Sequence, residues 1–360
     1  MMGKARNSSI ELLRIICIFC IIFMHTIAYG GEELAFYNRY IQIVLNCFTN
    51  LGVTCFVLIS GYYGVRFQLN KLIKMDLMII FYTISLLVIR LALGEDVGMM
   101  DLLSTAFPVL SNQYWYITSY FIIVILSEYI NQIPEKLSKA AFLKLLLVML
   151  FLFSVVSTFL SFDILRSEGK NVTHMLMIYL VGRYIRKYDD REYQKRRVAL
   201  LLAGNLLLTL GLETVLFVLT GRYSMFYRDC SILTVISAIL LFTIFRNMYF
   251  ESKIINKIAT AVLAVYVFSF GFQKLVYQLI PLEEYAFSPL FFPRICIFAP
   301  CVVIGCVLID LLRQKIFGNV EVRLADWLAN VLRTGIRLGK RIGIQFTDKV
   351  KNYIILKGGI

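Results

Sequence analysis

The sequence predicts an all-α integral membrane protein, and three observations lead to that prediction. Of 360 residues, 59% are hydrophobic and only 17% are charged, with a mean hydropathy of +0.75, whereas a soluble domain carries more charge. Long apolar runs such as 145–159 and 198–220 hold almost no ionisable side chains, and about 20 apolar residues span the bilayer hydrocarbon. These runs lack the alternation of barrel strands, so helices remain as the structure that satisfies the backbone in lipid.

The apolar runs between charged breaks predict about ten transmembrane helices. In chain order they lie near residues 10–30, 41–63, 72–93, 114–133, 142–162, 174–188, 198–219, 230–250, 257–280 and 290–312. The sixth range is short and is interrupted by Gly182 and Arg183. No small-residue cleavage site follows the first apolar run, so we expect it to be retained as a span.

The charges of the loops orient these spans. If the N-terminus is cytoplasmic, every second loop is basic; these loops contain Lys4, Arg6, Arg66, Lys71, Lys74, Lys136, Lys139, Lys144, Arg183, Arg186, Lys187, Arg191, Lys195, Arg196, Arg197, Arg246, Lys253 and Lys257. The alternate loops are acidic; they contain Glu32, Glu33, Glu95, Asp96, Asp101, Asp163, Glu168, Glu283 and Glu284. The positive-inside rule therefore predicts that both termini are cytoplasmic. The same rule explains the net charge of +14, because basic loops face the anionic lipid of the cytoplasmic leaflet. We therefore expect no nucleic-acid partner.

The last part of the chain differs from the rest, so we expect a membrane domain over residues 1–317 and a basic tail over 318–360. Apolar residues of the tail recur at helical spacing; they are Leu324, Trp327, Leu328, Val331 and Leu332. Basic residues flank this stretch and supply charge; they are Arg323, Arg333, Arg337, Lys340 and Arg341. This pattern predicts an amphipathic helix on the cytoplasmic leaflet.

The first predicted helix holds three ionisable residues, Glu11, Arg14 and His25, and such residues are costly inside a membrane. Arg14 and His25 are separated by three helical turns to within about 20°, so both face the same way about 16 Å apart along the axis. Glu11 lies one turn before Arg14 and can pair with it. A neutral imidazole can take a proton from a hydroxyl, so His25 is a candidate general base. The alternative is that His25 bonds a neighbouring helix as a structural residue.

The second and third spans contribute further candidates. Ser60, Gly61 and Tyr62 end the second span, where they can line a site, although small residues there can equally serve close helix packing. Lys71 and Lys74 lie one turn apart at a cytoplasmic helix start, where they can hold phosphate, although the positive-inside rule already explains them.

Other features favour structural roles. Tyr114 and Trp115 open the fourth span, where they either form the interfacial aromatic belt or contact a sugar. We expect His174 to be interfacial and Asp310 and Arg313, at i, i+3, to form a structural ion pair. Cys17 and Cys20 form a C-x-x-C motif inside an apolar helix, which favours buried small hydrophobes over redox chemistry. The sequence contains no P-loop and no cluster of metal ligands, so we expect no metal.

Several ordered motifs resemble acyltransferase family 3, a family of bacterial membrane proteins, between residues 8 and 317. The stretch 9–14 through His25 resembles the opening signature, an arginine followed by a histidine. The later similarities are 56–62, 114–120, 126–131, 179–186 and 309–313. The family differs from this chain in two places: many members have a histidine in the motif that contains Ser269 here, and an arginine pair where Lys71 and Lys74 stand.

The resemblance implies an inner-membrane O-acyltransferase, commonly one that takes acetyl from cytoplasmic acetyl-CoA and delivers it to a hydroxyl of an exported or surface polysaccharide or lipid-linked glycan. It implies His25 as the base, with Arg14, Lys71 and Lys74 positioning the donor, joined by Arg183 or Arg186. Glu11, Ser60, Gly61 and Tyr62 would line the site, and Tyr114 and Trp115 would contact the glycan. The alternative from another class is a transporter of polysaccharide or lipid-linked sugar without covalent chemistry, which broken helices at the midplane would favour.

Overall fold

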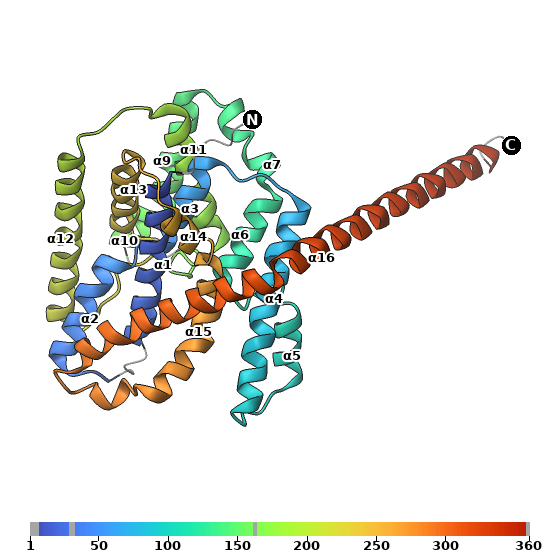
Figure 1. Ribbon diagram of the computed structural model, residues 1–360. Coiled ribbons are helices and arrows are strands. Elements are labelled where there is room, and N and C mark those ends of the chain that lie inside the picture. The colour runs from blue at the N-terminus through green and yellow to red at the C-terminus, as the bar shows by residue number, and fades with distance from the viewer. Residues whose placement is uncertain (1–6, 29–32, 161–163, 358–360) are drawn as a thin grey trace.

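The structure is a computed structural model that describes residues 7–28, 33–160 and 164–357. The described residues form helices and no β-strand (Figure 1), which confirms the predicted helical class. Four of the charged residues used to predict the orientation of the spans lie outside the described residues; they are Lys4, Arg6, Glu32 and Asp163.

Six segments of the described chain are long and apolar enough to cross a membrane. They are α1 (Ser8–Ala28), α2 with α3 (Phe36–Thr49 and Gly52–Tyr63), α4 (Leu69–Ala92), the Lys139–Phe159 segment, α12 (Lys195–Thr220) and the first part of α16 (Phe291–Lys357). A seventh would be α14 (Lys253–Ala259) with α15 (Val262–Leu279), which are bent by 54° at the break between them.

The remaining helices are shorter. They are α5 (Met99–Ala106), α6 (Trp115–Ile125), α7 (Ser127–Ile130), α8 (Ile133–Lys136), α11 (Val172–Tyr188) and α13 (Ile232–Arg246). The segment Lys139–Phe159 comprises α9 (Lys139–Leu150), a π-helical turn at Phe151–Val155 and α10 (Val156–Phe159), and a 3₁₀ turn spans Glu283–Tyr285. Each of the ten predicted ranges overlaps a helix, whereas the number of crossings and the side of each terminus stay predictions.

Helix α1 lies inside the bundle, where it packs against α3, α13, α14, α15 and α16 (Figure 1). Its apolar residues Leu13, Cys17 and Ile22 are buried. At its start, Ser9 Oγ donates to the carbonyl oxygens of Phe245 and Met248, at 2.8 Å each. These contacts fix α1 along its length, so the two functional candidates that it carries are held on one rigid element.

Two glycines allow α3 and α11 to pack closely. A Cβ atom on Gly61 would lie 2.1 Å from the carbonyl oxygen of Tyr179, and one on Gly182 would lie 2.5 Å from that of Leu58. Backbones can approach this closely only where side chains are absent. Gly182, which interrupts the sixth predicted range, is therefore a packing residue within an unbroken helix.

Helix α16 runs without a break from Phe291 to Lys357 and projects beyond the bundle (Figure 1). The expected boundary near residue 317 therefore lies within one helix. Ala325 and Ala329 are buried, whereas Trp327 and Val331 are exposed, and Arg333 donates to Asn70 at the start of α4. The placement of this tail on a membrane stays a prediction, and the side chains of Lys340 and Arg341 lie outside the described part.

The expected ion pair between Asp310 and Arg313 is present, with Nε 2.8 Å from Oδ1. Asp310 also accepts from Tyr82 at 2.8 Å and from Gln314 at 2.6 Å, and Arg313 pairs with Glu321. A buried carboxylate needs such compensation, so this network joins α4 to α16 where the helix leaves the bundle.

Candidate active site

Two cavities lie along α1. The first, here called the Arg14 cavity, has a volume of about 780 Å³ and is lined by Arg14, Ile18 and Ile21 of that helix. The second, here called the His25 cavity, has a volume of about 670 Å³ and is lined by Ile22 and His25 of the same helix. The residues of α1 that line the first cavity end at Ile21, and those that line the second begin at Ile22.

The Arg14 cavity has a charged end and an apolar end. Arg14 pairs with Glu11 at 3.1 Å, as predicted, and both line the cavity with Ser60 and Tyr62. Its apolar wall is built from aliphatic and aromatic side chains; they include Ile18, Ile21, Phe56, Tyr116, Val262 and Leu263. The cavity can therefore take a molecule that combines an anionic group with an apolar part.

The His25 cavity combines aromatic and polar side chains. His25 is exposed to it, and Tyr114 and Trp115 line it as well. Its other polar lining residues are Thr83, Arg90, Glu95, Thr105, Gln113, Ser269, Gln273, Lys274, Tyr277 and Glu283. Aromatic rings beside hydrogen-bonding groups suit a hydroxyl-rich ligand.

Tyr266 lines both cavities. Its ring centroid lies 5.5 Å from that of Tyr116 in an edge-on contact and 6.3 Å from that of Tyr114. These three tyrosines form an aromatic partition between the cavities. The shared residue Tyr266 therefore marks where the two cavities adjoin.

Three predicted site residues lie outside the lining of both cavities. Gly61 is buried in the contact between α3 and α11, while Lys71 and Lys74 are exposed on α4. Met75, the next residue on α4, does line the Arg14 cavity. The structure thus brings Glu11, Arg14, Ser60 and Tyr62 together in one cavity and His25, Tyr114 and Trp115 in the other.

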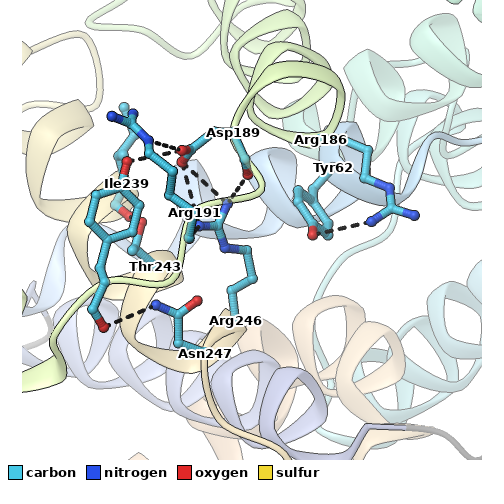
Figure 2. A network of polar contacts seen from close by, with 9 residues as sticks. Tyr62, Arg186, Asp189, Arg191, Ile239, Thr243, Arg246 and Asn247 are labelled. Atoms are coloured by element: carbon cyan, nitrogen blue, oxygen red, sulfur yellow. Dashed lines mark hydrogen bonds and ion pairs between the residues drawn. The ribbon is translucent and has the colours of Figure 1, made fainter.

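Two more arginines line the Arg14 cavity, Arg186 and Arg246. Arg186 lies over the ring of Tyr62, 5.3 Å from its centroid, and donates to the Tyr62 hydroxyl at 3.4 Å. Figure 2 shows this pair in one view with Arg246 and its partner Asp189. The family resemblance implied Arg186 as an accessory group but gave no role to Arg246, because nothing in the sequence of a basic loop indicates which side chain turns into a cavity.

Asp189 is the centre of a polar network in the loop after α11 (Figure 2). Its carboxylate accepts from Arg191 and Tyr193 at 2.9 Å each and lies 3.4 Å from Arg246. Burial opposes ionisation, but these hydrogen bonds and the arginine charges outweigh it and hold the pKa of Asp189 below its ordinary value. Asp189 is therefore ionised, and its carboxylate holds Arg246 in place.

The loop before α13 holds a buried carboxyl group, Asp229, whose Oδ1 has no hydrogen-bond partner in the described part of the chain. Burial raises the pKa of Asp229 to about 7, although the charge of Lys170 opposes the shift. The sequence gives no sign of this burial, because an aspartate in a loop between spans ordinarily faces water.

The apolar helices indicate a membrane protein. Its central helix carries ionisable groups into two adjoining internal cavities, as expected of a binding or catalytic site. The sequence model of the acyltransferase domain family matches residues 7–311, so the chain belongs to that family, acyltransferase family 3. It is therefore a multi-pass membrane acyltransferase. No curated protein and no solved structure is significantly similar to the chain.

Proposed function

We propose that the protein is an O-acyltransferase of the bacterial inner membrane that moves acetyl from cytoplasmic acetyl-CoA to a hydroxyl of an exported or surface polysaccharide or lipid-linked glycan. One observation carries the proposal: α1 places Arg14 in one cavity and His25 in the other, and the two cavities share Tyr266. Donor and acceptor can then approach one imidazole from opposite sides.

The reaction needs a base and a positioned thioester. His25 takes the proton of the acceptor hydroxyl while the hydroxyl oxygen attacks the thioester carbonyl carbon. The carbon–sulfur bond then breaks, and the proton passes from the imidazolium to the CoA thiolate. A positioned general base contributes about 10²- to 10⁴-fold to such a step. Arg14 holds the donor, and its pair with Glu11 at 3.1 Å fixes the direction of its guanidinium.

The acceptor belongs in the His25 cavity. Trp115 and Tyr114 offer ring faces to the apolar side of a sugar, while Gln113 and Glu95 offer hydrogen bonds to its hydroxyls. In this arrangement the acceptor hydroxyl and His25 lie in the same cavity, beyond the tyrosine partition from the donor's anionic part.

One observation favours the transporter alternative, namely the 54° bend between α14 and α15. Transporters build substrate sites at such broken helices. Against it, α1 carries both Arg14 and His25 without interruption, and membership of an acyltransferase family supports covalent chemistry.

The test uses purified protein in liposomes with acetyl-labelled acetyl-CoA and a soluble oligosaccharide. We expect release of free CoA thiol together with labelled sugar ester, both lost in His25→Ala and retained in His174→Ala, the matched substitution of the other histidine. Passage of oligosaccharide across the vesicle membrane without CoA release would instead support the transporter.

A further inference from the structure

The polar end of the Arg14 cavity holds three arginines, and their charges are unevenly compensated. Arg14 is paired with Glu11 and Arg246 with Asp189. Arg186 forms no ion pair with a carboxylate in the described ranges, and its contacts are with the ring and hydroxyl of Tyr62. A guanidinium placed on an aromatic ring keeps its donors available for a ligand.

Asp189 does not neutralise this end of the cavity, because it is shared. The same carboxylate serves Arg246 and also Arg191, which is not a lining residue, so Arg186 is the lining arginine that has no carboxylate partner among the described residues. Arg246 is held by its contact with Asp189 and by hydrogen bonds that it donates to the carbonyl oxygens of Asp189 and Arg191, at 3.0 and 3.1 Å. The result is a preorganised site with excess positive charge, which suits an anion.

Exposed aromatic rings line the same cavity as these cations. Tyr63 and Tyr249 both line the cavity and are 57% and 68% exposed. Their ring surfaces are therefore accessible to a ligand. Base stacking on such rings is favourable and does not depend on sequence. Guanidinium groups bind phosphate oxygens in pairs, which the point charge of a lysine cannot do.

We propose that Arg186 and Arg246 form the phosphate-binding subsite for the nucleotide part of the donor, with Tyr63 and Tyr249 as the stacking surface for its purine. This rests on the proposed function, because it assigns the phosphates of CoA to a cavity wall built by α11 and α13. It moves the phosphate site away from Lys71 and Lys74, which are exposed and outside the cavity lining.

The test measures binding of CoA, adenosine 3′,5′-bisphosphate and pantetheine to purified protein in detergent by calorimetry. Each of Arg186→Gln and Arg246→Gln should raise the Kd for CoA and for the bisphosphate by about 10- to 100-fold, because a charge-assisted bond is lost. Pantetheine has no phosphate on this subsite, so its Kd should not change. Arg186→Lys should give an intermediate Kd, since it keeps the charge and loses the fork.

Two further variants make the result decisive. Arg197→Gln removes an exposed arginine near the start of α12 and should leave all three Kd values unchanged. If Lys71→Gln with Lys74→Gln weakens CoA binding while the arginine variants bind normally, the inference is wrong. It is also wrong if the wild type binds neither CoA nor the bisphosphate.

Failure of the proposed function is distinguishable from failure of this subsite. Normal CoA binding that depends on Arg186 and Arg246, without any acetyl transfer, would refute the function and leave the subsite standing. Acetyl transfer with an unchanged KM for acetyl-CoA in both arginine variants would refute the subsite and leave the function standing.

Discussion

Replacement of Gly61 by alanine tests how the α3–α11 contact holds the Arg14 cavity together. The added Cβ would lie 2.1 Å from the carbonyl oxygen of Tyr179, whereas ordinary contacts begin at 3.4 Å, so the helices must separate by about 1.3 Å, the difference between these distances. Overpacking of this kind costs about 1–3 kcal/mol. The separation also moves Tyr62, on α3, away from Arg186, on α11, so we expect weaker CoA binding as well as lower stability.

The assay is thermal unfolding of the purified protein in detergent, followed by CoA binding. Gly211→Ala is the matched control, because Gly211 lies inside α12 with nothing within 4 Å of the added Cβ. Alanine is the better helix former by up to about 1 kcal/mol, so this control should melt at the same temperature or higher. Equal melting temperatures for Gly61→Ala and Gly211→Ala would refute the packing argument.

Three further perturbations follow from the geometry. Tyr266→Ala joins the two cavities, so water should reach the thioester and the ratio of acetate to sugar ester should rise about tenfold, which corresponds to about 1.4 kcal/mol of barrier; an unchanged ratio would contradict the partition. The raised pKa of Asp229, about 7 through burial, means that the folded state binds more protons than the unfolded state between pH 4 and 7. Stability should therefore fall across that window by up to about 4 kcal/mol, and Asp229→Asn should flatten the curve of melting temperature against pH. Asp310→Asn removes one of the two carboxylates paired with Arg313, the other being Glu321, and should cost about 1.5–3 kcal/mol, seen as a lower melting temperature; Asp96→Asn, at an exposed position in the loop before α5, should change it little.

The sequence predicts most of what periodicity and charge determine. The positions of the helices follow from apolar runs, and the Glu11–Arg14 and Asp310–Arg313 pairs follow from their i, i+3 spacing. The alignment of Arg14 and His25 on one helix follows from the pitch. Such inferences depend on residues of one element, and a single sequence contains that information.

Features that depend on contacts between distant segments could not be predicted from the sequence. Gly182 reads as a weakness in a span, whereas it is the point where α11 meets α3. Charge predicts that Lys71, Lys74 and Arg246 lie on the same side of a membrane. The packing of helices, which charge does not reveal, directs Arg246 into the cavity and leaves the lysines outside its lining. Tyr266 belongs to two cavities at once, and no pattern along the chain indicates that.

Mass spectrometry of surface glycan tests whether His25 is the base in acyl transfer to that glycan. A deletion strain is complemented with the wild type, with His25→Ala or with His174→Ala as the matched histidine substitution, and membrane levels of each protein are checked. We expect acetyl mass increments with the wild type and with His174→Ala, and none with His25→Ala. Full acetylation by His25→Ala, or glycan that is truncated in the deletion strain with no change in acylation, would contradict it.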